Sequence, residues 1–562
     1  MTSAARSARS RDALGIATRA VLAVGVALRL VAYVRRDILW LDEAATARNI
    51  VERSLHELLA VPLDYAQAAP KGFLLLEWVA SRTLGTSDLA LRLVPFASGI
   101  ASLFLFAAIA RRLLAPAGAL AAVLFCSVGY WFLVYSADVH PYGLDLALSL
   151  GALFLALELE RTAFPISRVW GTAVYGAAAV WFSNATVITL FGLGIALGVV
   201  AVHTRGFRGA LQALWPIAAT WAVTAAGAAW VAAHGMPPND REYFQALYRG
   251  GMVPVLRSAS ALRWLWDAWR VQLSLWHGWS VDDARWTSLY VAIALAGFVS
   301  LLWRRTNAAI LVGSIVAAFV AVSMAKQYPY DPRFLLPSLA MFIIGVGESI
   351  GVLATAGAAR SAFAFRGLAM LLCVPPIYRV IAYPPPYQWT VVGSYLRQIR
   401  ARWQPGDVVY TTYDRALEVV HSAPRFDFAR EDYILGPCST GDRRASLRAA
   451  DALRGRRRVW LIAGPGLFFP FSAEYGYLRA IGVQRDSLGV RLPGSIRASS
   501  PEPFDIPTAY LFDLSDSTRL ARSTPETYSR SALLHAMGRG ANRWSCHGVW
   551  SPLVRESGGA TR

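Results

Sequence analysis

Two adjacent acidic residues stand out in the stretch YVRRDILWLDEAATARNI. Asp42 and Glu43 follow a long apolar segment, and apolar residues flank the pair on both sides. A carboxylate that is partly buried against a membrane surface loses hydration, which tends to raise its pKa and makes it a useful general base. Consecutive side chains diverge by about 100° on a helix and about 180° on a strand, so only one of the two can point fully into a cleft. The pair therefore predicts one catalytic base at the membrane edge.

Two later stretches offer further acids, bases and cations. YSADVHPYGLDL contains Asp138, His140 and Tyr142, and YPYDPRFLLP contains Asp331 and Arg333. Each stretch lies between two apolar segments. A carboxylate can take a proton from a hydroxyl, and an arginine can bind a phosphate through two parallel hydrogen bonds. Together these residues suit chemistry on a substrate that carries both a hydroxyl and a phosphate.

Lysine is rare in this chain, and both lysines lie beside an apolar segment. Lys71 occurs in AQAAPKGFLLLEW and Lys326 in MAKQYPYDPRF. Lysine is a compact point charge that can bind a phosphate. The alternative is that both are interfacial lysines that extend toward lipid headgroups. The neighbouring acidic and basic residues favour the phosphate interpretation.

The turn that contains Asp138 and His140 could also hold a metal ion. Asp138 and His140 are two residues apart, which on a turn can bring both to one divalent cation. The alternative is a hydrogen bond between the two residues that orients the turn. Both interpretations stay open at this point.

The elements that position these residues are expected to be membrane-spanning helices. Of 562 residues, 55% are hydrophobic and 16% are charged, whereas soluble domains carry about 25% charged residues. Several apolar runs approach the ~20 residues that cross ~30 Å of hydrocarbon as a helix. We expect eleven spans, near 13–34, 89–110, 117–135, 141–159, 169–184, 185–202, 211–233, 286–303, 308–325, 334–353 and 367–383.

Orientation follows from the arginines in the short connections, because basic short loops stay cytoplasmic. One set of connections carries Arg6, Arg9, Arg11, Arg19, Arg111, Arg112, Arg161, Arg168, Arg205, Arg208, Arg304, Arg305, Arg360 and Arg366. We therefore expect a cytoplasmic N-terminus and outer loops at 35–88, 234–285 and 326–333. These loops belong to a membrane domain (1–383), followed by an outer domain (384–562).

The tail is predicted to be a small α/β domain. GDVVYTTY and RRVWLIAGP each have the pattern of a buried strand, and DRRASLRAADALRGR has a helical pattern. Cys438 and Cys546 are the two cysteines of this domain. A disulfide between them is one interpretation, since disulfides occur outside the cytoplasm; two free thiols are the other.

The charge and the sequence pattern also bear on whether the protein binds nucleic acid or is a transporter. The net charge of +19 comes almost entirely from arginine, many of these arginines lie in the connections between spans, and no nucleic-acid-binding motif accompanies them. We therefore expect no nucleic-acid partner.

The segment SALRWLWDAWRVQLSLWHGW is rich in tryptophan, which favours the headgroup region, so we expect helices that lie on membrane lipids. We see no internal repeat or pair of interrupted helices of the kind that transporters show.

The ordered set of segments resembles the GT-C superfamily of membrane glycosyltransferases. The similarity is greatest to the glycosyltransferase family 39-like group, which includes protein O-mannosyltransferases and the lipid A aminoarabinose transferase. The matching motifs are LDEA, APKGFLLLEW, SDLALRLVPFASGI, ADVHPY and PRFLLP, over roughly residues 20–160 and 320–345. This chain departs from the family pattern at Lys71, His140 and Phe334, where many relatives have proline, arginine and tyrosine.

The resemblance implies a GT-C fold and an inverting transfer. A sugar would move from a polyprenyl-phosphate donor to a hydroxyl of an envelope lipid, glycan or protein, on the outer face of the bacterial cytoplasmic membrane. It implies Asp42 as the base with support from Glu43, and some relatives hold a divalent metal ion. We expect Lys71, Arg333 and Lys326 at the donor phosphate, and Asp138, His140, Tyr142 and Asp331 at the substrate. The alternatives are a transporter or flippase of a lipid-linked sugar, and a GT-C-type glycan ligase or polymerase.

Overall fold

The computed structural model describes residues 3–273, 284–356, 361–387, 390–437, 443–463, 473–489, 509–516 and 524–529. The chain forms two compact units. The first, which we call the membrane unit, comprises Met1–Arg36, Ala69–Gly235 and Tyr248–Tyr387. The second, the sheet unit, comprises Asp37–Ala68, Met236–Leu247 and Gln388–Arg562. Each unit is described by itself.

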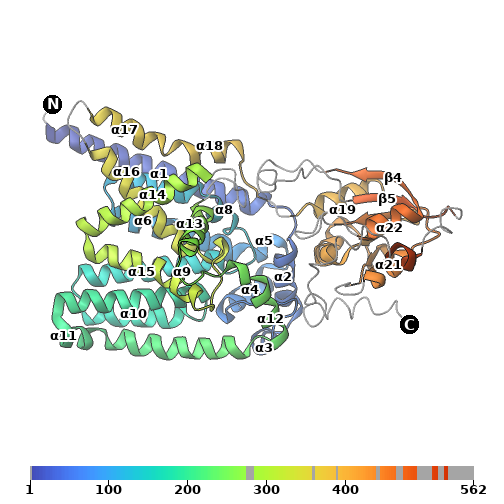
Figure 1. Ribbon diagram of the computed structural model, residues 1–562, viewed down its shortest axis with the longest axis horizontal. Helices are drawn as coiled ribbons and strands as arrows, with labels where there is room; N and C mark the ends of the chain where they lie inside the picture. The colour runs from blue at the N-terminus through green and yellow to red at the C-terminus, as the bar shows by residue number, and fades with distance from the viewer. Residues whose placement is uncertain are drawn as a thin grey trace. The chain divides into compact units, whose positions relative to one another are not determined.

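The membrane unit is helical (Figure 1). Its helices are α1 (Ser3–Arg35), α4 (Lys71–Leu84), α5 (Asp88–Leu91), α6 (Leu93–Leu113), α7 (Pro116–Val128), α8 (Tyr130–Val134), α9 (Tyr142–Arg161), α10 (Ile166–Ala179), α11 (Asn184–His234), η1 (Arg249–Gly251), α13 (Ala259–Leu273), α14 (Ala284–Arg304), α15 (Thr306–Met324), η3 (Pro332–Phe334), α16 (Leu336–Thr355), α17 (Ala362–Leu371) and α18 (Val374–Ala382).

The predicted spans coincide with helices. Among the described residues, eight helices are long and apolar enough to cross a membrane. One of these is α11, which covers two predicted spans and is kinked at Gly206, where φ is 72°. The remaining predicted spans correspond to the shorter helices α7 and α10. The predicted class, a multi-span helical protein with a C-terminal α/β region, is confirmed.

Helix α16 is the most enclosed of the long helices. In its apolar window 83% of the residues are buried, against 17% in α1. Glycines permit this close packing: a Cβ on Gly297 of α14 would lie 1.8 Å from the Gly345 carbonyl oxygen of α16. A Cβ on Gly118 of α7 would lie 2.3 Å from the Gly347 carbonyl oxygen. Small residues at such crossings let helix backbones approach closely in a membrane.

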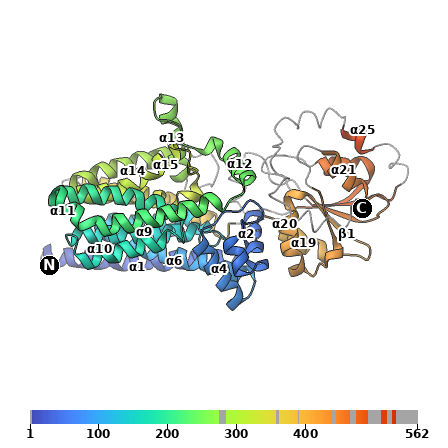
Figure 2. The same ribbon diagram turned by 90° about the horizontal axis from the view of Figure 1, so that it is seen from below.

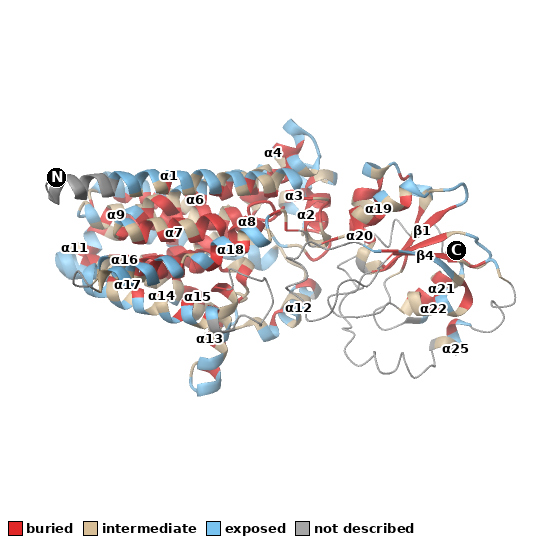
Figure 3. Cartoon of the chain, turned by 90° about the horizontal axis from the view of Figure 1, so that it is seen from above, coloured by how far each residue is buried: buried red, intermediate tan, exposed pale blue. Residues whose placement is uncertain are grey.

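The outward faces of the helices are apolar and exposed. Figure 3 colours α7 and α8 mainly as buried, whereas α1 shows exposed and intermediate residues along its length. Figures 1 and 2 show α9, α10 and α11 side by side. Exposed Phe191, Ile195 and Trp215 of α11 are examples of large apolar side chains on this outward surface, as a hydrocarbon environment requires.

One charged side chain inside a span donates hydrogen bonds to backbone carbonyls. Arg29 of α1 is fully buried, and its guanidinium donates to the carbonyl oxygens of Gly25 (3.0 Å), Cys126 (3.1 Å) and Ser127 (3.3 Å). Carbonyls in the last turn of a helix have no partner within it. Arg29 therefore supplies hydrogen-bond donors to carbonyl oxygens at the C-terminal end of α7, just before the short α8 begins.

The sheet unit is an α/β domain with two inserted segments. Its elements are α2 (Leu41–Glu52), α3 (Leu55–Ala60), α12 (Pro238–Leu247), α19 (Val392–Ala401), β1 (Val408–Thr411), η4 (Tyr413–Arg415), α20 (Ala416–Ser422), η5 (Ala423–Phe426), η6 (Arg430–Asp432), β2 (Tyr433–Leu435), α21 (Arg443–Asp451), β3 (Val459–Ile462), α22 (Ala473–Ile481), β4 (Val483–Leu488), β5 (Ala509–Asp513) and α25 (Pro525–Ser529). The strand order is β2-β1-β3-β5-β4.

The sheet is mixed. β1 pairs in parallel with β2 and β3, whereas β5 is antiparallel to β3 and β4. Tyr410, Leu461 and Phe512 point to the face covered by Leu447 of α21 and Leu478 of α22, and Figure 2 shows α21 and α19 on opposite sides of the sheet. The predicted strands in GDVVYTTY and RRVWLIAGP are β1 and β3, and the predicted helix is α21; all three are confirmed.

Two segments that precede the C-terminal region in the chain also belong to this unit. Asp37–Ala68, which carries the acidic pair, and Met236–Leu247 form part of the same compact unit as the C-terminal sheet. We expected both within loops of the membrane domain. The chain passes from the membrane unit to the C-terminal part of the sheet unit after Tyr387, close to the predicted boundary. Cys438 and Cys546, for which a disulfide was one of two interpretations, lie outside the described residues.

Candidate active site

The acidic pair opens helix α2, and the two carboxylates have different surroundings. Glu43 is fully buried, and its carboxylate accepts a hydrogen bond from the backbone N–H of Trp40 at 3.3 Å. The first N–H groups of a helix need such a partner from outside the helix ladder. Asp42, one residue earlier, is half-buried. Glu43 is thus used to cap the helix, and Asp42 is the member of the pair that keeps access to solvent.

A second buried carboxylate fixes the start of α2 on the sheet unit. Glu418 of α20 is fully buried, and its Oε1 accepts from the backbone N–H of Leu41 at 3.1 Å. Thr390 donates its hydroxyl to Oε2 at 2.5 Å, and Arg415 lies 3.1 Å from Oε1. Hydrogen bonds to charged groups are stronger than neutral ones. The residue directly before Asp42 is therefore anchored to the C-terminal part of the chain.

The loop after α3 is held against α2. Asn49 exchanges hydrogen bonds with the backbone of Asp64, accepting at 2.9 Å and donating at 3.2 Å. Arg53 pairs with the Asp64 carboxylate at 2.6 Å. Tyr65 and Ala66 are buried and have positive φ values of 63° and 49°, which non-glycine residues seldom adopt. Such strain persists only where the surroundings determine the backbone, so this loop is rigidly defined.

In the membrane unit, Asp138 lies in the turn between α8 and α9. It is fully buried, and its Oδ2 lies 3.8 Å from the Nη2 of Arg36. Arg36 also donates to the carbonyl oxygens of Val134 (3.3 Å) and Ala137 (2.7 Å). One guanidinium thus holds both the carboxylate and the backbone of the turn. Asp138 is placed by an ion pair.

The other residues of this turn pack in an aromatic cluster. The His140 ring lies 5.1 Å from the Tyr142 ring, centroid to centroid. Tyr142 in turn makes edge-to-face contact with Phe334 at 5.7 Å, and Phe334 with Tyr248 and Tyr328 at 5.5 Å each. These contacts bring the turn before α9 next to the loop before α16. Two segments predicted to share the site are therefore adjacent.

Arg333 is oriented from several sides. Its Nη2 donates a short hydrogen bond to the Tyr248 hydroxyl, and its Nε lies 3.6 Å from Oδ1 of Asp331. The guanidinium carbon lies 5.0 Å from the Phe334 ring centroid and 5.5 Å from that of Tyr248. The side chain is still 19% exposed. It is a preorganised cation with residual access, directly before the apolar helix α16.

Asp331 has two roles in this loop. Its Oδ1 accepts from the backbone N–H of Arg333 at 3.2 Å and so caps η3. Burial raises the pKa of the Asp331 carboxyl above its ordinary value, and the neighbouring Arg333 offsets part of this rise. Next to it, Tyr330 accepts from the indole N–H of Trp269 in α13 at 3.0 Å. One tryptophan of the predicted interfacial segment therefore supports the loop.

The two lysines differ in position. Lys71 is the first residue of α4, after Pro70, and is half-buried. Lys326 has a positive φ of 60°, and its ammonium donates to the carbonyl oxygen of Val253 at 2.8 Å. Lys326 thus links two loops of the membrane unit, which gives it a structural contact in addition to its predicted role at a phosphate.

The metal interpretation does not fit the surroundings of Asp138. Its carboxylate faces the positive charge of Arg36, and the His140 backbone N–H donates to the Asp138 carbonyl oxygen at 2.6 Å. Within the described ranges, no group of three or more His, Cys, Asp or Glu residues could hold a metal ion. We therefore derive no step of the reaction through a metal.

The structure thus adds three residues to the predicted set, namely Arg36, Tyr248 and Glu418. Arg36 is visible in the sequence as a cation at the end of the first span, although its partner is not. Tyr248 and Glu418 carry no local signal, because each acts through a partner far away in the chain. Asp42 and Glu43 lie in one unit, and the remaining predicted site residues lie in the other.

No protein-family model matches the chain, and no curated protein matches its sequence. Solved structures of low sequence identity resemble it. ArnT from Cupriavidus metallidurans bound to undecaprenyl phosphate is 14% identical, with a TM-score of 0.48 over 88% of this chain and 98% of that chain. The Archaeoglobus fulgidus oligosaccharyltransferase in complex with Zn and sulfate is 12% identical, with a TM-score of 0.44 over 72% of this chain and 61% of that chain.

A further structure is the archaeal oligosaccharyltransferase AglB from Archaeoglobus fulgidus in complex with an inhibitory peptide and a dolichol-phosphate. It is 12% identical, with a TM-score of 0.42 over 79% of this chain and 69% of that chain.

Proposed function

We propose that this protein is an inverting glycosyltransferase of the GT-C type. It moves a sugar from a polyprenyl-phosphate donor to a hydroxyl acceptor on the outer face of the bacterial cytoplasmic membrane. The observation that carries the proposal is Arg333, a cation oriented by Tyr248 and Asp331 immediately before an apolar helix. A preorganised cation at a membrane edge suits a phosphate whose lipid part lies in the hydrocarbon.

The reaction is a single displacement. The acceptor oxygen attacks the anomeric carbon, and the Asp42 carboxylate takes the hydroxyl proton. The bond between the anomeric carbon and the phosphate oxygen breaks, and polyprenyl phosphate leaves with the electron pair. Arg333 and Lys71 stabilise the negative charge that develops on this leaving group. Attack from the opposite side inverts the anomeric centre.

The division of roles within the acidic pair supports Asp42 as the base. Glu43 is fully buried and accepts from the Trp40 N–H, so a substrate hydroxyl would have to enter the packed start of α2 to reach its carboxylate. Asp42 is half-buried on the same turn. A general base must come within about 2.6–3.2 Å of the proton it abstracts, directly or through one water, and the more accessible carboxylate meets that requirement with less rearrangement.

Chain connectivity links the two groups of site residues. Asp42 follows Arg36 by six residues in the chain. Arg36 pairs with Asp138 in the turn before α9. His140 and Tyr142, on the same turn, are proposed to contact the sugar or the acceptor.

The proposed sidedness follows from the basic connections. The arginines at the ends of α6, α9 and α14 favour the cytoplasm, which leaves the candidate site on the other side. Nucleotide sugars are cytosolic, so an outward-facing transferase needs a donor that arrives within the bilayer. A polyprenyl-phosphate sugar meets this need, because its chain partitions into the hydrocarbon and its phosphate lies at the interface.

The test is transfer by purified protein in lipid nanodiscs, with a radiolabelled polyprenyl-phosphate sugar and membrane extract as the source of acceptor. Asp42→Asn keeps the shape of the side chain and removes the proton acceptor. We expect turnover to fall about 10²-fold or more with donor binding unchanged. Glu43→Gln keeps an oxygen for the Trp40 N–H and is the matched control, with a much smaller loss.

The outcomes separate the candidate functions. Near-full activity of Asp42→Asn together with an inactive Glu43→Gln would show that Glu43 is the base and Asp42 the supporting residue. Movement of intact donor across the bilayer without transfer would indicate a flippase instead. Transfer of whole glycans, with no transfer of single sugars, would indicate a ligase.

A further inference from the structure

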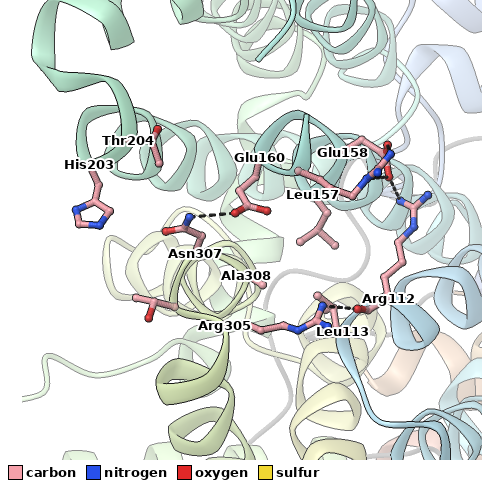
Figure 4. A pocket seen from close by; sticks show the side chains of 12 residues that line it. Arg112, Leu113, Leu157, Glu158, Glu160, His203, Thr204, Arg305, Asn307 and Ala308 are labelled. Carbon is pink, nitrogen blue, oxygen red and sulfur yellow. Dashed lines mark hydrogen bonds and ion pairs between the residues drawn. The ribbon is translucent and has the colours of Figure 1, made fainter. Parts of the chain in front are cut away.

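The membrane unit contains a cavity that none of the predicted site residues lines. It has a volume of about 670 Å³ and lies among the end of α6, the end of α9, the middle of α11 and the start of α15 (Figure 4). Helix α9 has 20 residues, so its two ends are about 30 Å apart. His140 and Tyr142 lie at its other end. The cavity is therefore about one bilayer thickness from the candidate active site.

Three arginines and two glutamates line this cavity, and a fourth arginine, Arg168, contacts one of the glutamates. Glu158 is already engaged by three arginines: Arg112 at 2.7 Å, Arg161 at 2.9 Å and Arg168 at 2.8 Å. One carboxylate therefore faces three positive charges. The excess of cations is what an anion would neutralise.

The remaining charged side chains that line the cavity are Glu160 and Arg305, one of each sign. Glu160 accepts from the Asn307 amide at 3.0 Å, and Arg305 donates to the carbonyl oxygen of Arg112 (Figure 4). Arg305 thus makes its hydrogen bond to a neutral group and keeps its full charge at the cavity. Among the described residues, no carboxylate forms an ion pair with Arg305.

The first turn of α15 also faces the cavity. Thr306, Asn307 and Ala308 line it, and α15 begins without a side-chain cap. The first N–H groups of a helix have no partner within the helix, and the helix dipole makes that end positive. This turn adds hydrogen-bond donors to the guanidinium groups that define the site.

We infer that this cavity binds the phosphate headgroup of an anionic phospholipid. Leu113, Leu157 and Ala308 supply apolar lining beside the cations, and the ends of apolar helices lie at the depth of lipid headgroups. Basic pockets between membrane helices are known sites for anionic headgroups. The volume equals that of about 20 water molecules, which accommodates a phosphate with its glycerol. The inference does not depend on the proposed transferase activity.

The experiment measures lipid retention by the full chain. Protein is placed in nanodiscs of phosphatidylcholine with increasing phosphatidylglycerol, and bound lipid is counted by native mass spectrometry after mild extraction. The variant is the double substitution Arg112→Gln and Arg305→Gln; Glu158 keeps Arg161 and Arg168 in it. Arg111→Gln is the matched control, because Arg111 is the exposed neighbour of Arg112 and does not line the cavity.

We expect the wild type and Arg111→Gln to retain phosphatidylglycerol over phosphatidylcholine, and the double variant to bind it about tenfold more weakly or worse. Equal retention by the double variant, or no preference of the wild type for phosphatidylglycerol, overturns the inference. A second arm adds inorganic phosphate to protein in pure phosphatidylcholine and follows its melting temperature. Stabilisation by phosphate alone equal to that by phosphatidylglycerol overturns the assignment to a lipid.

The lipid titration of the wild type keeps the test decisive if the double variant does not fold. Its melting temperature should rise with phosphatidylglycerol content and this rise should weaken at high salt. A melting temperature independent of phosphatidylglycerol overturns the inference without any variant.

Discussion

The buried carboxylate of Glu418 accepts a hydrogen bond from the backbone N–H of Leu41, with 3.1 Å between Oε1 and N. Leu41 is the first residue of α2 and immediately precedes Asp42. Glu418 lies in α20 of the sheet unit, close to β1 in sequence. The C-terminal part of the chain therefore helps to define the position of the proposed catalytic base.

This contact predicts that Glu418 acts through Asp42. In Glu418→Ala the N–H of Leu41, the Thr390 hydroxyl and Arg415 lose their shared acceptor. We expect kcat to fall about 10–100-fold, because small misplacements of a catalytic group have effects of this size, with the donor KM nearly unchanged. Glu418→Gln keeps an oxygen for the Leu41 N–H and should restore part of the activity. Steady-state kinetics in nanodiscs measure both quantities.

A double variant separates this positioning role from general damage to the fold. In the Asp42→Asn background, Glu418→Ala should cost little further activity, since the group it positions is already inactive. Glu431→Ala, which removes an exposed glutamate of the same unit, is the control and should be neutral. If the losses from Asp42→Asn and Glu418→Ala simply multiply, Glu418 does not act through Asp42.

Arg333 is predicted to hold the leaving phosphate through its geometry as well as its charge. Arg333→Lys keeps the charge but loses the planar fork, so we expect the donor KM to rise about 10²-fold. Tyr248→Phe removes the hydroxyl that accepts from Arg333 and should raise the donor KM about tenfold, in line with one hydrogen bond to a charged group.

The control for both variants is Arg257→Lys, an exposed arginine in the loop before α13. It should leave the donor KM unchanged. If Arg333→Lys also turns over the donor at the wild-type rate with a wild-type KM, Arg333 does not bind the phosphate.

Donor affinity should depend on pH through Asp331. Its pKa is raised by burial, so the carboxyl stays neutral to a higher pH than an ordinary aspartate, which titrates near pH ~4. As the pH rises through the folded-state pKa, a negative charge appears 3.6 Å from the Arg333 Nε and competes with the donor phosphate. The donor KM should therefore increase with pH across this window.

Asp331→Asn isolates the effect, because its amide oxygen can still accept from the Arg333 N–H and cap η3. The donor KM of this variant should be flat over the same pH range. The stability of the fold changes in the same sense: a raised folded-state pKa gives stability at low pH that is lost as the pH rises through it. An unaltered pH profile in Asp331→Asn would assign the titration to another group.

The sidedness of the membrane is tested by cysteine labelling in whole cells. Single cysteines replace Ser3 or Ser557 in a cysteine-free chain, and a membrane-impermeant maleimide is added before and after permeabilisation. Ser557→Cys should be labelled in intact cells and Ser3→Cys only after permeabilisation. Labelling of both from the same side contradicts the proposed topology.

Much of the scaffold is determined by the sequence alone, for a local reason. An apolar run long enough to cross hydrocarbon forms a helix there, because every backbone polar group must be satisfied within the segment. All eleven predicted segments coincide with helices, and the buried strands Val408–Thr411 and Val459–Ile462 lie where short apolar runs placed them. The types of residue that bear chemistry are also read directly from the chain.

The partners of those residues were decided by the tertiary structure. Glu418 and Leu41 are 377 residues apart, Arg333 and Tyr248 are 85 apart, and Arg36 contacts a carbonyl 101 residues away. No local pattern encodes such pairs, because each depends on how the whole chain packs. From the residue types alone Asp42 and Glu43 were alike, and only the family resemblance implied Asp42 as the base. The packing of Glu43 into the start of α2, where the Trp40 N–H needs an acceptor, distinguishes the buried cap from the accessible carboxylate.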